Sequence, residues 1–206
     1  MLRKGAWAEM FSTVMVIVVL GFMFFSFELH RTSSKEIALV AVMSAVAAIG
    51  RVAFAALPNV QATTFIVMVS GYVMGPSAGF MVGAAAALVS NFFMGQGPWT
   101  PWQMLAWGLS GASAGLIKKL FPSISRAGMI IFCFLWGYFF GWIMNLWYWS
   151  AFIRPLNINS FIAACISSIW LDSFHAAGNA VLYFCFGQGF IKILGRFYRR
   201  LKVTVR

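Results

Sequence analysis

Long apolar runs alternate with short polar gaps along the whole chain. Seven runs stand out, with approximate bounds Met10–Phe27, Ile37–Leu57, Ala62–Met74, Ala78–Met94, Trp102–Ile117, Gly128–Trp149 and Phe161–Leu194. Uncharged apolar runs of about 20 residues are typical of membrane-spanning helices. The pattern therefore predicts an all-α integral membrane protein with seven spans. The third run is too short to cross a bilayer unless it is tilted or partly re-entrant.

Composition supports this fold class and narrows the classes of function. Hydrophobic residues make up 62% of the chain and charged residues 9%, a balance that a soluble domain of this size does not tolerate. The formal charge of +11 does not indicate nucleic-acid binding, because the cations lie in the polar gaps and in the C-terminal tail. The three cysteines lie within apolar runs and have no paired spacing, so we predict no disulfide framework, no metal site and no cofactor.

The cations also predict an orientation in the membrane. Placing the gap 30–36, the loop 118–126 and the tail on one side gathers most lysines and arginines there, although Arg3 and Lys4 fall on the other side. Cytoplasmic loops carry an excess of Lys and Arg, so this side, with the C-terminus, is predicted to be cytoplasmic. The loop 58–61, the tryptophan-rich segment described next and the loop around Arg154 would then all face outside.

Met94–Trp107, the tryptophan-rich segment, is the most unusual stretch between two apolar runs. Pro98 and Pro101 are predicted to exclude helix there and to form a short, stiff loop. Indole rings also line lipid interfaces in general, which is the alternative explanation for them. A binding loop is favoured, because the rings of Trp99, Trp102 and Trp107 are interleaved with Gln96, Thr100 and Gln103.

Polar side chains recur at helical spacing inside three of the spans. One face of the last span carries Ser168, Asp172, His175 and Asn179; similar stripes are Tyr138, Trp142, Asn145 and Trp149, and Gln103, Trp107 and Ser110. Ionisable groups at membrane depth usually pair with one another or line a cavity. Asp172 and the deep cation Arg51 therefore leave two interpretations open, a structural ion pair between them or a ligand cavity that contains Asp172 and His175.

Sequence motifs for energy coupling and catalysis are missing. The chain has no phosphate-binding loop of the Gly-x-x-x-x-Gly-Lys-Ser/Thr type, and it has neither His-Glu-x-x-His nor Gly-x-Ser-x-Gly. It also lacks the two matching halves found in many secondary transporters. These features predict a binding protein, and not an enzyme, that depends on a partner for energy.

From Lys35 to the C-terminus the chain resembles the S component, the substrate-binding membrane subunit, of energy-coupling factor (ECF) vitamin transporters. The resemblance is carried by the small-residue face Ala41-Val-Met-Ser-Ala45, the loop Pro58-Asn-Val-Gln61, the short helix after it, and Gly97-Pro-Trp-Thr-Pro-Trp-Gln103. The last of these looks most like the branch for cobalamin and related corrinoids. The family resemblance implies a six-span S-component core at 35–206, preceded by one extra transmembrane helix and a connector at 1–34. That extra helix and Arg51 are departures from the family pattern.

The resemblance implies an ABC-type importer in the bacterial cell membrane. The S component captures a vitamin from outside and topples against a transmembrane coupling subunit that two cytoplasmic ATPases drive. Ala41 and Ala45 would contact the coupling subunit. Together, the loops and stripes give the predicted substrate-binding residues Asn59, Gln61, Gln96, Trp99, Trp102, Gln103, Trp107, Asn145, Trp149, Arg154, Asp172, His175 and Asn179.

Three alternatives stay open at this stage. The same machinery could carry another vitamin, such as pantothenate, folate or a pyridoxine-like compound. Of these, the anionic vitamins should need a cationic anchor, for which Arg154 is the outer-loop candidate. A membrane enzyme would use Asp172 and His175. A structural membrane-assembly protein would not need three polar loops on one side.

Overall fold

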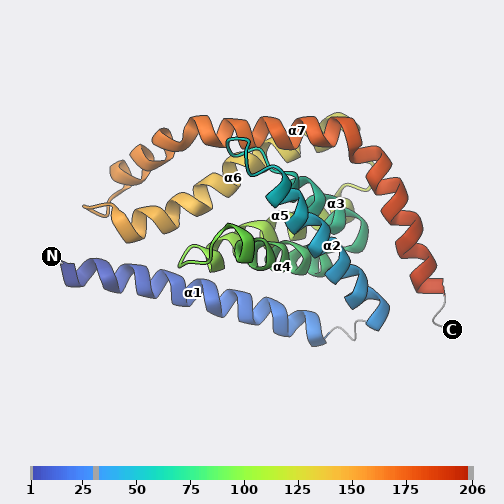
Figure 1. Ribbon diagram of the computed structural model, residues 1–206, viewed down its shortest axis with the longest axis horizontal. Helices are drawn as coiled ribbons and strands as arrows, with labels where there is room; N and C mark the ends of the chain where they lie inside the picture. The colour runs from blue at the N-terminus through green and yellow to red at the C-terminus, as the bar shows by residue number, and fades with distance from the viewer. Residues whose placement is uncertain (1, 30–32, 204–206) are drawn as a thin grey trace.

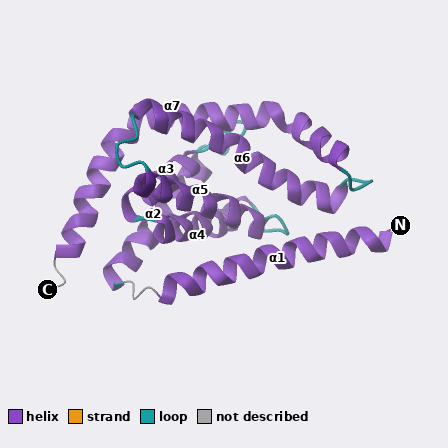
Figure 2. Ribbon diagram, turned by 180° about the vertical axis from the view of Figure 1, so that it is seen from behind, coloured by secondary structure: helices purple, strands orange, loops and turns teal. Residues whose placement is uncertain are grey.

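The chain folds entirely into helices joined by short loops (Figures 1 and 2). The structure is a computed structural model that describes residues 2–29 and 33–203. Within these residues the seven helices are α1 (Leu2–Leu29), α2 (Ser34–Ala53), α3 (Ala62–Met74), α4 (Pro76–Met94), α5 (Thr100–Leu120), α6 (Arg126–Phe152) and α7 (Ile158–Val203). The all-α fold and its seven helical segments agree with the sequence pattern.

Local sequence signals explain most of the helix boundaries. The hydroxyls of Ser33 and Ser125 accept backbone N–H bonds at the starts of α2 and α6. Gly75, with φ of 104°, separates α3 from α4 in a conformation that favours glycine. Pro76 and Pro101 both lie in the first turn of a helix, where proline is tolerated. The prediction that Pro101 excludes helix was therefore wrong, because α5 already begins at Thr100.

Five of the seven helices are long and apolar enough to cross a membrane, namely α1, α2, α4, α6 and α7. α3 has 13 residues and is the short apolar helix that the sequence predicted. α5 has the length but carries Gln103, Lys118 and Lys119. The predicted bounds 161–194 for the last span were too short, since α7 has 46 residues. At 1.5 Å per residue it measures about 69 Å, far beyond a bilayer core of about 30 Å.

α3 forms the centre of the bundle. Eleven of its residues are buried, among them Thr63, Thr64 and Val67. It lies among α2, α4, α5 and α7 (Figure 1). Gly79 and Gly111 allow the backbones of α4 and α5 to approach closely. A side chain on either glycine would collide with the backbone of the other helix. The Gly-x-x-x-Gly spacings of α4 and α5 thus serve helix packing.

α1 lies along one side of the bundle, and its end lies close to the start of α2 (Figures 1 and 2). Val16 and Leu20 are its buried residues, in a cluster with Phe80, Ala84 and Trp102. Most of its other described side chains are exposed, including Val18 at 65%. α1 is therefore a peripheral helix that contacts α4, α5 and α6 along a single stripe.

The loops divide between two ends of the molecule. Loops 95–99 and 153–157 lie toward the side on which α1 begins, and loop 54–61 lies nearer the middle of the molecule, against α7 (Figures 1 and 2). We call the region of these three loops the three-loop end. The α5–α6 loop and the end of α7 lie toward the opposite side. There the Tyr198 hydroxyl donates to Glu36 Oε1 at 2.9 Å and to the Met74 carbonyl at 3.3 Å, fixing α7 to α2 and α3.

Candidate functional site

A buried arginine organises the polar groups below the three-loop end. Arg51 lies in the last turn of α2 and is only 6% exposed. Its Nη1 donates to Ser90 Oγ at 2.7 Å and to Asn91 Oδ1 at 2.5 Å, both at the end of α4. Its guanidinium carbon lies 4.7 Å from the centroid of the Trp107 ring, a cation–π contact. The Nε atom is buried without a hydrogen-bond partner.

Amide side chains continue this network to the surface. Asn91 Nδ2 donates to Thr100 Oγ1 at 2.9 Å and to Gln103 Oε1 at 2.8 Å. The Thr100 hydroxyl in turn donates to Gln96 Oε1 at 2.9 Å. Asn91 is buried, Gln103 is half-buried and Gln96 is exposed. The tryptophan-rich segment is therefore joined to Arg51 by a continuous line of polar side chains.

A second set of contacts joins α3, α5 and α7 through Trp107. The Trp107 Nε1 donates to Thr64 Oγ1 at 2.9 Å, and Thr64 Oγ1 lies 2.8 Å from His175 Nε2. The Phe140 ring contacts both Trp107 and His175, at centroid distances of 4.6 and 5.0 Å. His175 Nδ1 is buried and unpaired. We call these two connected sets the central polar network: Arg51, Thr64, Ser90, Asn91, Gln96, Thr100, Gln103, Trp107 and His175.

Asp172 belongs to a separate chain of polar contacts between α6 and α7. Asn145 Nδ2 donates to Ser168 Oγ at 2.8 Å, and Ser168 Oγ donates to Asp172 Oδ2 at 2.7 Å. Asp172 also lines a groove of about 570 Å³ whose walls include Tyr138, Trp142 and Phe161. Arg51 makes its hydrogen bonds to α4, so the structure does not contain the Arg51–Asp172 ion pair that the sequence left open.

Four other predicted residues lie in or against the helix bundle. Asn59 Nδ2 donates to the Leu171 carbonyl at 2.8 Å and so joins the α2–α3 loop to α7. Asn179 Nδ2 lies 3.4 Å from the Cys133 carbonyl. Gln61 Oε1, Asn179 Oδ1 and Trp102 Nε1 are buried without hydrogen-bond partners. Trp102 packs in the cluster that contains α1, so it lies apart from Trp107.

Three further predicted residues lie around the α4–α5 and α6–α7 loops. Trp99 packs edge-to-face on Trp147, with the ring centroids 5.9 Å apart. Trp149 Nε1 donates to Ser160 Oγ at 2.8 Å. Arg154 donates to the carbonyls of its neighbours Ser150 and Ile153. The structure therefore joins Gln96, Gln103, Trp107 and His175 in one network and leaves Trp99, Trp149 and Arg154 outside it.

Sequence reasoning missed several members of the central polar network. Ser90 and Asn91 follow the alanine-rich part of α4 and were not among the predicted residues. Thr64 is one of a threonine pair at the start of α3. A polar pair that ends an apolar run is the signal that could have identified them. Their partner Arg51 was noticed but was given no role beyond a possible ion pair.

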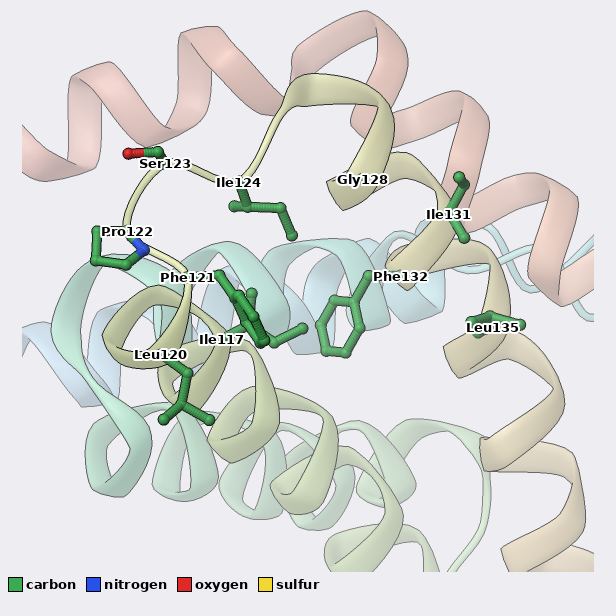
Figure 3. A pocket seen from close by; sticks show the side chains of 10 residues that line it. All are labelled: Ile117, Leu120, Phe121, Pro122, Ser123, Ile124, Gly128, Ile131, Phe132 and Leu135. Carbon is green, nitrogen blue, oxygen red and sulfur yellow. The ribbon is translucent and has the colours of Figure 1, made fainter.

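An apolar groove lies away from this network (Figure 3). It has a volume of about 690 Å³ and is lined by α5, the α5–α6 loop and the start of α6. Phe121 and Phe132 are among its apolar walls (Figure 3). None of the predicted binding residues lines it, and it belongs to the end opposite the three loops.

Comparison with known proteins identifies the family. The family model described as "ECF transporter, substrate-specific component" matches residues 35–198. The chain belongs to this family. No curated protein and no solved structure matches the chain. The matched segment begins in the first turn of α2 and leaves α1 outside it.

Family membership gives the general function of this S component. It is the substrate-binding subunit of an ECF transporter in a membrane, and its partners are a substrate and an energising module. It is therefore a transporter subunit and not an enzyme, which excludes the catalytic interpretation of Asp172 and His175. Among the described residues, no group of three or more His, Cys, Asp or Glu side chains is placed to hold a metal ion.

Proposed function

We propose that this S component captures a vitamin, a corrinoid such as cobalamin, at its three-loop end and delivers it for ATP-driven import. The central polar network is the observation that carries the proposal. It joins five helices below the tryptophan-rich segment and reaches the surface at Gln96. The corrinoid assignment rests on the resemblance of Gly97–Gln103 to that branch and on the number of indole rings nearby.

Two kinds of contact would hold such a ligand. The half-buried ring of Trp99 offers apolar surface to a ligand, whereas Trp102 and Trp107 are already buried and would support the site from below. Each Å² of this apolar surface that a ligand covers contributes about 25 cal/mol. Amides such as Gln96 and Gln103 both donate and accept hydrogen bonds, which suits the amide-rich rim of a corrinoid.

An exposed face on α2 supports the proposed coupling contact. Ala41 and Ala45 are exposed, whereas Met43, Ser44 and Ala47 face the core. Small residues on a membrane helix allow a partner helix to approach closely. We propose that this face meets the transmembrane coupling subunit, which two cytoplasmic ATPases drive. The binding step uses the three-loop end, so binding and coupling occupy different surfaces of the S component.

We also propose the orientation and the division of the chain. The three-loop end faces outside, and the opposite end, with Lys118, Lys119 and Arg126, faces the cytoplasm together with the C-terminus. Residues 35–206 form the substrate-binding core, and residues 1–34 add the extra helix and its connector. The location is the bacterial cell membrane.

A second candidate ligand is an anionic vitamin such as pantothenate or folate. Arg51 favours it, because a buried guanidinium suits a carboxylate. Arg154, the anchor that the sequence suggested, makes its hydrogen bonds to neighbouring backbone carbonyls and is exposed. The cationic anchor for an anionic ligand would therefore be Arg51.

Ligand titration of the purified full chain in detergent tests the site. Cyanocobalamin should bind one-to-one with nanomolar affinity, followed by calorimetry and tryptophan fluorescence. Replacing Trp99 and Trp102 together with Ala should weaken binding by at least about 10-fold, the loss of roughly 1.4 kcal/mol. The matched control is Trp170→Ala, since Trp170 is 75% exposed on α7. Unchanged affinity in the double variant would reject this site.

A further inference from the structure

The chain holds a deeply buried cation for which the described residues supply no counter-charge. The whole sequence has four acidic residues. Asp172 accepts a hydrogen bond from Ser168, and Glu36 accepts one from Tyr198. Within the described part of the chain, no carboxylate forms an ion pair with Arg51. Its polar partners, Ser90 and Asn91, are both neutral.

Such a cation is costly in a membrane protein. Moving a charged side chain toward the centre of a bilayer is unfavourable, so cations there pair or face a cavity. The Trp107 ring and two hydrogen bonds offset part of this cost for Arg51 and leave its charge in place. A ligand that brings a negative charge would complete the compensation, which makes this position a binding determinant.

The Arg51 guanidinium also has a free edge whose shape suits a carboxylate or phosphate. Both hydrogen bonds that Arg51 donates to described residues come from Nη1. Nε is buried without a hydrogen-bond partner. Nε–H and the adjacent Nη2–H point in parallel and form the side-on fork that binds two oxygens of a carboxylate or phosphate. This fork is the part of the side chain that the fold leaves unused.

A line of polar side chains leads from the surface to the Arg51 guanidinium. It passes from exposed Gln96 through Thr100 to buried Asn91, which also contacts half-buried Gln103 and accepts from Arg51 Nη1. Loop 95–99 begins at Gly95, whose φ of 105° is a conformation that favours glycine. The exposed amide of Gln96 and the half-buried amide of Gln103 carry N–H donors, which suit an anion near the surface.

We propose that Arg51 binds an oxyanion of the transported substrate through its Nε–Nη2 edge. The inference rests on the proposed function and adds the chemical class: an organic molecule with a carboxylate or a phosphate ester. Anionic vitamins carry the first, and corrinoids with a complete nucleotide loop carry the second. Arg51 is then the specificity residue that rejects uncharged analogues, because an uncharged ligand leaves the buried cation uncompensated.

Two matched ligand pairs separate the carboxylate from the phosphate ester. Panthenol is the uncharged alcohol counterpart of pantothenate, and dicyanocobinamide lacks the nucleotide loop and phosphodiester of cyanocobalamin. Each ligand is titrated into the full chain in detergent by calorimetry. In at least one pair the oxyanion-bearing member should bind about 10- to 100-fold more tightly, as expected for one charge-assisted pair of hydrogen bonds.

Variants then assign the discrimination to Arg51. Arg51→Gln should abolish the preference within the pair, and Arg51→Lys, which keeps the charge but lacks the fork, should retain part of it. Arg196→Gln is the matched control, because Arg196 is exposed near the far end of α7. If Arg51→Gln does not fold, the comparison of Arg51→Lys with the wild type still decides the question. If Arg51 has only a structural role, Arg51→Gln should lower the affinities for both ligands of a pair equally.

A second readout does not need a vitamin. Acetate and inorganic phosphate, compared with chloride at equal ionic strength, should raise the thermal unfolding temperature of the wild type and of Arg196→Gln, but not of Arg51→Gln. If this holds while no vitamin binds, the oxyanion site stands and the proposed function fails. If vitamins bind regardless of charge and the anions stabilise all variants alike, the proposed function stands and the oxyanion site is wrong. If neither the vitamin titrations nor the anion series gives the expected result, both the oxyanion site and the proposed function are wrong.

Discussion

At the scale of single residues, Asn91 is the branching point of the central polar network. Its Oδ1 accepts from Arg51, and its two Nδ2 hydrogens go to Thr100 and Gln103. All hydrogen-bonding groups of this amide are therefore used across α2, α4 and α5. Its side chain is 1% exposed, so none of these bonds can be replaced by bulk water. One side chain thus fixes both the buried cation and the start of α5.

Asn91→Ala should destabilise the fold measurably. The substitution removes one of the two hydrogen bonds that Arg51 donates and leaves Gln103 Oε1 without its donor, and each buried polar group left unpaired costs about 1–3 kcal/mol. We expect a lower unfolding temperature in detergent, measured by tryptophan fluorescence. Asn159→Ala is the control, because Asn159 is exposed at the start of α7. Equal unfolding temperatures for the two variants would show that the amide is not needed for stability.

At the scale of helices, glycine contacts hold the centre of the bundle. α3, α4 and α5 approach so closely that a side chain on Gly71, Gly79 or Gly111 would meet backbone atoms of a neighbouring helix. Apolar side chains gain little from packing together in lipid, so close backbone contact supplies much of the association energy. This contact also holds the ends of α4 and α5 side by side, where Asn91 and Thr100 meet.

Gly111→Ala should therefore destabilise the bundle. Its Cβ would collide with the backbone of Gly79, and overpacking of this kind costs about 1–3 kcal/mol. Gly189→Ala is the matched control in α7, since nothing lies within 4 Å of the Cβ it would add. The control should be neutral or slightly stabilising, because Ala favours helix more than Gly. A Gly111→Ala protein as heat-stable as the control would contradict this packing.

At the scale of the whole molecule, the proposed binding and coupling surfaces differ. The central polar network lies below the three-loop end, whereas the exposed Ala41 and Ala45 lie on the outer side of α2. Both surfaces share α2, because Arg51 is in its last turn. A ligand held by Arg51 would thus act on the same helix that presents the coupling face.

Bulky residues on the coupling face should block import and spare binding. Ala41→Trp with Ala45→Trp would prevent close approach of the coupling subunit, while the buried residues of α2 keep their contacts. Uptake of labelled ligand in cells that express the complete transporter should fall by at least about 10-fold. Val18→Trp on the exposed side of α1 is the control and should transport normally. Normal uptake by the double variant would reject this coupling face.

Sequence reasoning recovered the helices better than the site. Apolar runs predicted seven helical segments, and the short third run was interpreted correctly. The end of α7 was missed, because Arg196, Arg199 and Arg200 look like a tail although helical hydrogen bonding continues through them. The partners of Arg51 are 39 and 40 residues away in sequence, and no periodicity within one helix reveals such a pairing.

Titration of the purified full chain with vitamins tests the central claim most directly. Cyanocobalamin, pantothenate and folate are added separately to protein whose folded state is verified by cooperative thermal unfolding. We predict saturable one-to-one binding of one of them at nanomolar concentration, about −12 kcal/mol, without the ATPases or the coupling subunit. Folded protein that binds none of the three would contradict the account of this chain as a vitamin-capturing subunit.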